Sequence, residues 1–432
     1  MDPLRDSSNS GADPPRRDCS VSFFGTFYPE HDLVGSVSTG LVRFLSESDG
    51  IDRIRVFAQR GAAFPQGWGV PTERMQLIPT WQPDRPLSLV RALVSLFRAG
   101  KLSDIYLFNM HMTYCGRSRI ANGIGLLLPV IVRFLTRRPV VTYMHNLLET
   151  QDVISLGYYP SLWTKLIVKL LEFNLVRNTR LIVPLQSQAQ AIARAFNRKV
   201  DVLPLPNIEG AWSVASSNIT DATRNLGEVR VLLFGNWGPA KDLPGALASL
   251  DALRAKGYRI SVTVAGSYGS HHLEWKQRLA ELRDFYSKRG FSFLSTVPED
   301  EVFGLFMRND VLLLPYNSTG GYSGVMNLGS LSGASIIAYD LPQLREYEGI
   351  LRSGTQFISP QSVTDLARAL DSVSKAPPGI VERWVVVGAR LRACKVSVEQ
   401  LAHMLTEVAN QFRKRRSLRS AMTALTPKVV HD

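Results

Sequence analysis

Cysteine is scarce in this chain of 432 residues, and its three cysteines form no pattern. They are far apart and lack the spacing of metal ligands, which predicts reduced, structural thiols and favours a cytoplasmic protein. Aspartates are not paired as D-x-D either, which favours a reaction without metal. The cysteines are Cys19, Cys115 and Cys394, and the isolated aspartates are Asp104, Asp242 and Asp340.

Long apolar runs are also missing. No segment reaches the roughly 20 apolar residues that a membrane-spanning helix needs. The nearest, residues 123–135, contains Pro129 and Arg133 and is followed by two further arginines, so we expect a core helix there. Residues 1–18 are polar and rich in Pro, Ser and Asp, without the apolar centre of a signal peptide, which predicts a disordered leader.

Negative charge is in deficit. The chain has 50 Lys and Arg residues against 37 Asp and Glu, a formal net charge of +13. Such an excess predicts a polyanionic partner: nucleic acid, an anionic lipid surface or a phosphorylated substrate. No aromatic and basic module of an RNA-binding domain is present, so we do not expect nucleic acid.

What the sequence does contain is an alternation of short β-rich apolar runs with longer helical patterns. This is typical of parallel sheets built from βαβ units and predicts an α/β protein with two Rossmann-like domains. The strands are expected to start near residues 19, 53, 104, 139, 180 and 199, and then near 229, 260, 291, 310 and 334.

A polar stretch without any period lies between the two groups of strands. We therefore expect an N-terminal domain over residues 19–208, a linker over 209–228 and a second domain over 229–385. A helical pattern and a basic tail occupy residues 386–432.

The first chemical feature is a glycine turn with a lysine, directly after the apolar run 229–234. Gly235, Asn236 and Gly238 shape the turn, and Lys241 stands just before a helical pattern. A lysine there can reach a phosphate as a point charge, while amides at the helix start bind other oxygens. The alternative is a solvated loop lysine, which any α/β domain can carry.

The second feature is a glycine and serine loop that opens another helix. It follows a predicted strand that ends at Tyr316, and Ser323 and Gly324 stand where the helix begins. Glycines there let the backbone approach an anion closely, although a simple capping loop has the same pattern. Two such turns at the carboxyl ends of parallel strands predict a site for the diphosphate of a nucleotide sugar.

The order of these motifs resembles that of the GT-B glycosyltransferases, especially the family 4 (glycosyltransferase group 1) retaining enzymes. The lysine turn is followed by V-A-G at 264–266 and by S-G-A-S-I-I-A-Y-D at 332–340. Residues 21–36 resemble the family's first strand and glycine loop, 142–149 its histidine segment, and 200–210 the segment that ends its first domain. The resemblance covers about residues 20–416. It implies two Rossmann-like domains facing across a cleft, with a C-terminal helix crossing back to the first domain.

The resemblance also implies roles for individual residues, with His145 and Lys241 as the catalytic pair. For His145 the alternative is a loop histidine with ordinary hydrogen bonds, and Glu149 either orients it, contacts the acceptor or caps a helix. The implied donor-binding residues are Gly235, Asn236, Gly266, Tyr316, Ser323, Gly324, Val325 and Asn327. The implied acceptor-side residues are His31, Gly35, His111 and Glu149. No metal is expected, and no cofactor besides the nucleotide diphosphate sugar as co-substrate.

One departure from the family pattern concerns two carboxylates. The family carries an E-x7-E pair that binds the donor sugar and the ribose, and here the two positions are Gly320 and Leu328. Those tasks must pass to other groups, such as Ser323, Asn327 or backbone amides, or to a substitute carboxylate such as Glu346.

We therefore expect a glycosyltransferase that moves a sugar from a nucleotide diphosphate sugar to a glycan or lipid-linked saccharide, with retention and without metal. One alternative is a non-catalytic nucleotide-sugar or glycan-binding homologue, motivated by the missing glutamates. Another is a nucleotide-sugar epimerase of the same architecture.

Residues 161–180 bear on a membrane contact. Two interpretations are open: a basic amphipathic helix that binds an anionic membrane at the inner face, or the more common helix packed in the core with solvated lysines. A basic cluster near the C-terminus, residues 413–419, supplies a second basic patch. The apolar residues at helical spacing are Leu162, Trp163, Leu166, Ile167, Leu170 and Leu171, with Lys165, Lys169 and Glu172 on the other side.

Overall fold

The computed structural model describes most of the chain. The described residues are 19–28, 33–65, 68, 72–99, 102–112, 114–116, 118–150, 160–208, 227–268, 274–295, 297–319, 323–375 and 379–425. The predicted leader, most of the predicted linker, His31 and Gly320 lie outside them.

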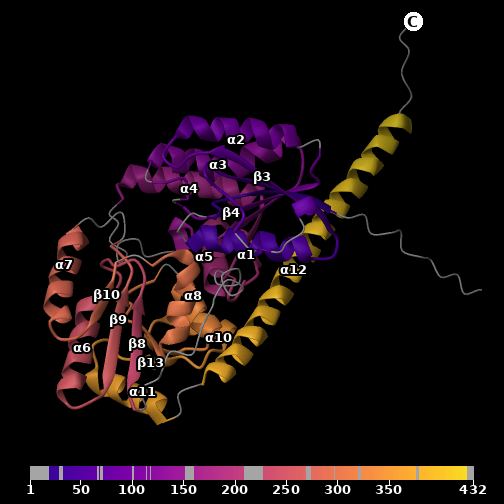
Figure 1. Ribbon diagram of the computed structural model, residues 1–432. Helices are drawn as coiled ribbons and strands as arrows, with labels where there is room; N and C mark the ends of the chain where they lie inside the picture. The colour runs from indigo at the N-terminus through magenta and orange to yellow at the C-terminus, as the bar shows by residue number, and fades with distance from the viewer. Residues whose placement is uncertain are drawn as a thin grey trace, which may run out of the picture.

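The first half of the chain folds into a seven-stranded parallel sheet of order β3-β2-β1-β4-β5-β6-β7 (Figure 1). The six expected strands are present. Strand β3 was not predicted, because Pro79 lies within it, as proline does at the edge of a sheet. The strands are β1 Cys19–Phe24, β2 Ile51–Gln59, β3 Met75–Trp81, β4 Ile105–Met110, β5 Val140–Met144, β6 Arg180–Val183 and β7 Asp201–Val202.

The second half forms a six-stranded parallel sheet of order β10-β9-β8-β11-β12-β13. The five expected strands are again present, and the short edge strand β13 was missed. The strands are β8 Val229–Phe234, β9 Ile260–Ala265, β10 Ser292–Leu294, β11 Val311–Leu314, β12 Ser335–Tyr339 and β13 Gln356–Ile358. The predicted pair of α/β sheets is confirmed.

Helices cover both faces of each sheet. On the first sheet, α2 Pro86–Ala99, α3 Arg119–Thr136, α4 Leu162–Asn178 and α5 Gln186–Phe196 share one core, and α1 Leu33–Glu47 lies on the other face. On the second sheet, one face carries α6 Leu243–Ala255, α7 Glu274–Ser287 and α11 Val363–Lys375. The other face carries α8 Glu299–Arg308, α9 Gly324–Ser332 and α10 Pro342–Leu351.

The last helix, α12 Ile380–Leu425, joins the two halves (Figure 1). Near its start, Val387 packs with Phe303 and Leu331 of the second half. Further along, buried apolar side chains between Cys394 and Ala409 enter the core between α1 and the first sheet. The predicted helix that crosses back to the first domain is confirmed.

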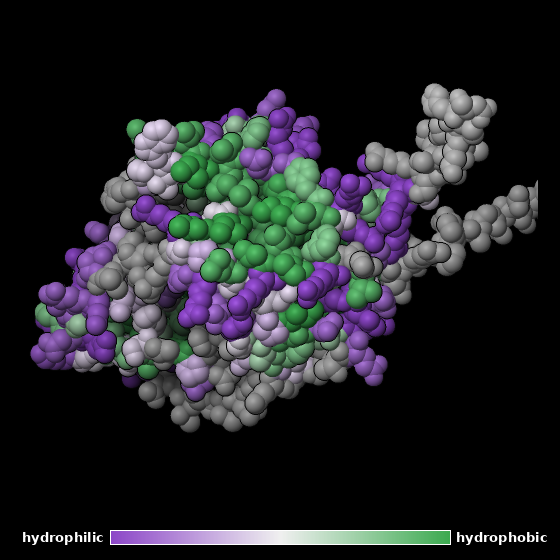
Figure 2. All heavy atoms as spheres, turned by 90° about the horizontal axis from the view of Figure 1, so that it is seen from above, coloured by the Kyte–Doolittle hydropathy of each residue, from purple (hydrophilic) through white to green (hydrophobic). Residues whose placement is uncertain are grey.

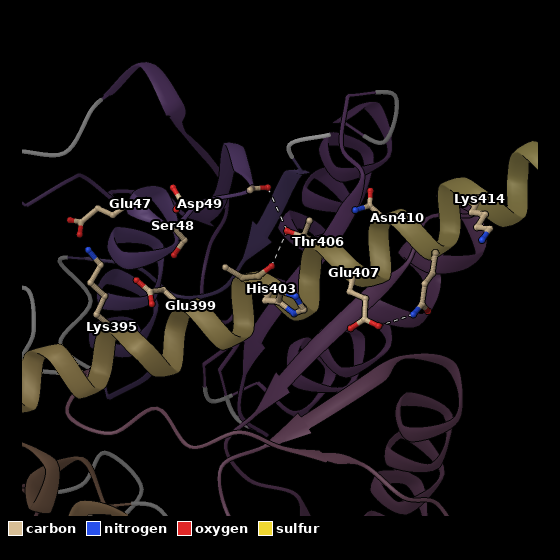
Figure 3. A pocket seen from close by; sticks show the side chains of 13 residues that line it. Glu47, Ser48, Asp49, Lys395, Glu399, His403, Thr406, Glu407, Asn410 and Lys414 are labelled. Carbon is tan, nitrogen blue, oxygen red and sulfur yellow. Dashed lines mark hydrogen bonds between the residues drawn. The ribbon is translucent and has the colours of Figure 1, made fainter. Parts of the chain in front are cut away.

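Where α12 crosses the end of α1, a groove of about 1000 Å³ opens between them (Figure 3). Polar side chains such as Glu47, Glu399 and His403 line it. Its floor is tied by Thr406, whose hydroxyl donates to the carbonyl oxygen of Ala402 (2.9 Å). The groove lies beside Gly50, just before β2, and so at the amino edge of the first sheet.

Helix α3 is the expected core helix over residues 123–135, and it is also the one described helix that is long and apolar enough to cross a membrane. It lies between α2 and α4, and 39% of it is buried. Its start is capped by Ser118, and its end by Arg137 with a left-handed backbone.

For α4, the core interpretation is wrong. Its apolar stripe points outward, with Trp163 75% exposed, while Glu172, Leu175 and Val176 face the protein. The reason is that α4 packs on α3 and on the short 3-10 helix at Leu148–Thr150 with the side that bears Glu172. The opposite side, which bears the apolar stripe, therefore faces outward.

The start of α12 is fixed by one arginine. Arg383 is 2% exposed, and its guanidinium donates hydrogen bonds of 2.8 to 2.9 Å to four carbonyl oxygens. Those oxygens belong to Phe306, Met307, Asn309 and Ser332, at the ends of α8 and α9, where carbonyls have no partner within the helix. The positive charge also offsets the helix dipoles there.

We expect Arg383→Met to lower the free energy of unfolding by about 3 kcal/mol, because it leaves buried carbonyls unsatisfied. Arg392→Met is the matched control, since Arg392 is an exposed arginine on the same helix. Urea denaturation followed by circular dichroism measures both. Equal stability of the two variants would contradict the role of Arg383.

Candidate functional site

The carboxyl edges of the two sheets meet. Every described strand pairing is parallel, so the loops after the strands gather at one edge of each sheet. Leu185, which follows β6, is fully buried in the core of the second half. The Ser187 amide donates to Glu346 Oε1 of α10 (3.1 Å), and the Asn207 amide donates to Asn327 Oδ1 of α9 (3.0 Å). Loops from both edges therefore face one another, as in two-domain ligand-binding folds.

The lysine turn begins at Gly235, directly after β8. Gly235 has a φ of +134°, and its amide donates to the carbonyl oxygen of Ala265 (3.1 Å). A Cβ at this position would lie 2.4 Å from Lys241 Nζ. The backbone conformation therefore requires glycine, and a methyl group here would make the flexible end of Lys241 shift. Gly266 has the matching role after β9, because a Cβ there would lie 2.1 Å from the Gly235 carbonyl oxygen.

Lys241 extends back across this turn between two aromatic rings. Its Nζ is 5.5 Å from the Trp237 ring centre and 5.0 Å from the Tyr316 ring centre. Removal from water lowers the pKa of the ammonium from 10.5 to about 8. Among the described residues no carboxylate pairs with it, so its charge is compensated by the two ring faces alone. Such a cation is ready to bind an anion.

The lysine turn and the second loop are tied together by backbone hydrogen bonds. The Asp242 amide donates to the carbonyl oxygen of Pro315 (2.7 Å), and the Asn317 amide donates to that of Ala240 (2.9 Å). Asp242 also caps α6 through the Gly245 amide (3.0 Å). The two predicted turns therefore form one structural unit.

In the second loop, Ser323 caps α9, and its hydroxyl accepts a hydrogen bond from the Met326 amide (3.2 Å). Burial raises the pKa of Tyr316 to about 12, and the neighbouring Ser323 side chain opposes that rise. Gly324 and Val325 are the first two residues of the helix, whose amides have no partner within it. Val325 lies beside the lysine turn, since its Cγ2 would be 3.6 Å from a Cβ at Gly235.

Two predicted donor-binding residues differ in exposure. Asn236, at the tip of the lysine turn, is exposed. Asn327 is completely buried, and its Oδ1 accepts hydrogen bonds from the Asn207 amide and the Tyr347 hydroxyl. Its side chain therefore joins the two halves of the molecule, and Leu328, at one position of the family's glutamates, packs partly buried beside it in α9.

On the opposite edge, His145 follows β5 and is 5% exposed. Its Nε2 lies 2.9 Å from Asn109 Oδ1, and Asn109 Nδ2 donates to the Ser38 hydroxyl (2.8 Å). Because that orientation makes Asn109 Oδ1 an acceptor, Nε2 carries the proton of the imidazole. Burial, assisted by the nearby His111, lowers the pKa of His145 to about 3, so the ring is neutral at ordinary pH.

The loops after β4 and β5 brace each other beside this histidine. The His145 amide donates to the carbonyl oxygen of Met110, and the Met112 amide donates to Asn146 Oδ1 (both 3.0 Å). His111 belongs to the loop after β4, and burial lowers its pKa to about 4. The structure thus brings the predicted residues His111 and His145 together at the carboxyl edge.

The remaining acceptor-side predictions lie around this point. Gly35 is buried in the first turn of α1, and its carbonyl oxygen accepts from Thr39 (2.8 Å). Glu149 pairs with Lys169 of α4 (3.0 Å). His31 is outside the described residues. The proposed substitute carboxylate, Glu346, is occupied by the Ser187 amide at the contact between the two halves.

Sequence reasoning missed three residues of this region. Trp237 packs its ring against Lys241, and Asn109 hydrogen-bonds His145. In the sequence, only their positions near the motifs could have indicated these contacts. Glu172 is completely buried, and its Oε1 accepts from the Leu148 amide (2.5 Å). Burial raises the pKa of Glu172 to about 8, which no helical pattern could reveal.

Comparison with protein-family models finds no match, and comparison with curated proteins finds none either. Solved structures do match over almost the whole chain. HepE from Anabaena, in complex with UDP, is 13% identical, with a TM-score of 0.54 over 92% of this chain and 99% of that one. The same protein has also been solved with UDP-glucose.

Two synthases match similarly. Trehalose 6-phosphate synthase from Burkholderia multivorans is 12% identical, with a TM-score of 0.55 over 96% of this chain and 100% of that one. Sucrose-phosphate synthase from Thermosynechococcus elongatus is 13% identical, with a TM-score of 0.53 over 93% of this chain and 100% of that one. The order of elements, the two parallel sheets and the returning last helix are those of GT-B glycosyltransferases, and this chain has the GT-B fold.

Proposed function

We propose that this protein is a glycosyltransferase that takes a sugar from a nucleotide diphosphate sugar and gives it to a glycan or lipid-linked saccharide, with retention and without metal. The observation that carries the proposal is the ammonium of Lys241, which is removed from water, lies against Gly235 and belongs to a turn that is bonded to the loop before α9. The binding of UDP and UDP-glucose by HepE, which shares the fold, supports the choice of donor.

The donor diphosphate would bind between the lysine and α9. The Met326 amide is taken by Ser323, which leaves the amides of Gly324 and Val325 for phosphate oxygens. Lys241 adds a full positive charge in a site of low polarity. As the bond to the sugar breaks, negative charge grows on the leaving diphosphate, and these groups stabilise it without having to reorganise.

His145 would act on the sugar as a neutral group. With a pKa of about 3 it is not an acid at ordinary pH, so its role is to hydrogen-bond and position the donor. Asn109 fixes the orientation of the ring. The acceptor would enter from the side of His111, Gly35 and Glu149.

A second candidate is a non-catalytic homologue that binds nucleotide sugars. It is favoured by the absence of carboxylates at Gly320 and Leu328, and by Asn327 being fully occupied in the contact between the two halves. In either case other groups would recognise the ribose and the sugar. The candidates are Ser323 and the exposed Asn236, which are polar side chains of the two turns. A place in the cytoplasm, in peripheral contact with the inner face of a membrane, belongs to the same proposal.

Turnover on a panel of nucleotide diphosphate sugars tests the function. We expect wild type to release nucleoside diphosphate, slowly without acceptor and faster with saccharide acceptors, and Lys241→Ala to lose at least about 100-fold in rate. Binding of UDP without any turnover would favour the non-catalytic homologue. Conversion of the donor to its epimer without acceptor would instead show an epimerase.

The pKa of Lys241 predicts how donor binding depends on pH. Below pH 8 the ammonium is charged and ready for a diphosphate, whereas above it binding must first take up a proton. We expect the Kd for UDP to rise by up to about tenfold per pH unit above 8. Titration calorimetry at pH 7 and 9, in two buffers of different ionisation enthalpy, measures the Kd and the proton uptake. In Lys241→Met both pH effects should vanish, and a flat wild-type profile would contradict the role of the lysine.

The contact between Gly235 and Lys241 gives an independent prediction. Gly235→Ala places a methyl group where the ammonium lies, so the end of Lys241 must shift and UDP binding should weaken. Gly257→Ala is the matched control, because Gly257 also has a positive φ (+94°) but a Cβ there meets nothing within 4 Å. Backbone strain is present in both variants, whereas only Gly235→Ala disturbs Lys241. Only Gly235→Ala should therefore weaken UDP binding. Equal Kd values for the two would contradict the proposed contact.

A further inference from the structure

Helices α2, α3 and α4 form one outer surface of the first domain, with α3 in the middle (Figure 1). Seen from above, their outer side chains make a broad apolar patch with polar groups around it (Figure 2). Most of the exposed large apolar side chains described in the protein lie here. They are Leu87, Val90, Val94, Phe97, Ile120, Phe134, Leu135, Leu162, Trp163, Leu166, Ile167, Leu170 and Phe173.

The exposed charges that these three helices carry have one sign, and one of them, Lys169, is paired with Glu149 of the neighbouring 3-10 helix. The three helices contain a single carboxylate, Glu172, which is completely buried and faces the protein. Their charged residues are otherwise basic: Arg91, Arg98, Arg119, Arg133, Lys165, Lys169 and Arg177. A patch of apolar side chains interleaved with cations, and without acidic groups on its own helices, complements a surface that is apolar inside and negative outside.

We propose that the α2–α4 surface docks on an anionic lipid bilayer, with its apolar side chains between the acyl chains and its arginines and lysines among the headgroups. The proposal deepens the one above, which rests on the site between the sheets. The sequence suggested one interfacial helix over residues 161–180, whereas the proposed surface consists of three helices. Charge complementarity decides the occupant, because a second copy packed symmetrically on this face would place cations against cations.

The surface would lie on the membrane and not span it. Helix α3 is buried on one side against the sheet and lies between α2 and α4, so it cannot leave the domain without breaking that core. Helix α4 presents Leu162, Trp163, Leu166 and Leu170 along one side, the pattern of a helix that enters a bilayer by part of its diameter. Tryptophan at the helix start suits the interface itself.

Positive charge continues from this surface to the last helix. Arg138, just after α3, lines a small pocket of about 290 Å³ together with Arg413 and Arg416 of α12. Arg413 is paired with Asp104 (2.5 Å), whereas Lys414, Arg415 and Arg416 are exposed. The end of α12 would therefore add headgroup contacts beside the apolar patch.

Vesicle cosedimentation of the full chain, without donor or acceptor, tests the proposal. We expect binding to vesicles of phosphatidylcholine with phosphatidylglycerol, and at least about tenfold weaker binding to phosphatidylcholine alone. The double variant Leu166→Glu/Leu170→Glu should bind at least about tenfold more weakly than wild type, since it removes apolar contact and adds negative charge. Both leucines are 59% exposed, so the fold should tolerate the change.

Val381→Glu/Val385→Glu is the matched control. These valines are 69% and 67% exposed on α12, away from the patch, and the variant should bind vesicles like wild type. If it lost binding equally, the effect would be one of net charge and the docking surface would be refuted. Circular dichroism of both variants shows that each is folded.

Trp163 reports insertion directly. Its emission should shift to the blue on addition of the anionic vesicles, and the shift should be absent in Trp163→Phe. No vesicle binding by wild type, together with a dimer that Leu166→Glu/Leu170→Glu dissociates, would overturn the proposal in favour of a second copy. Because UDP binding is measured separately, loss of the nucleotide site would leave the vesicle result intact.

Discussion

The position of the two sheets depends on a single helix that belongs to both cores. Helix α12 starts on the second half, where Arg383 holds the ends of α8 and α9, and its later turns fill the space between α1 and the first sheet. Apolar burial at both ends fixes the helix, and the helix fixes the orientation of the halves. Only then do the loops after the strands of the two sheets face one another.

The sequence was sufficient for the architecture because strand and helix periods are local properties. The two parallel sheets, the lysine turn after β8 and the serine cap of α9 all follow from patterns within a few residues. Two edge strands were missed, β3, which carries a proline, and β13, which has three residues, whereas the short edge strands β7 and β10 were predicted.

What the sequence could not supply is the environment of each side chain. The apolar stripe of α4 has the spacing of a core helix, and only its neighbours show that it faces outward. Asn327 has the sequence position of a donor ligand, yet its partners, Asn207 and Tyr347, come from distant elements. The lowered pKa values of Lys241 and His145 likewise arise from burial, which only the folded chain produces.

Glu172 gives the outer surface a mechanical link to the site. It lies on α4 beneath the exposed leucines and holds the Leu148 amide, three residues after His145. Because Glu172 is held on α4, any displacement of that helix would also displace the loop that carries His145.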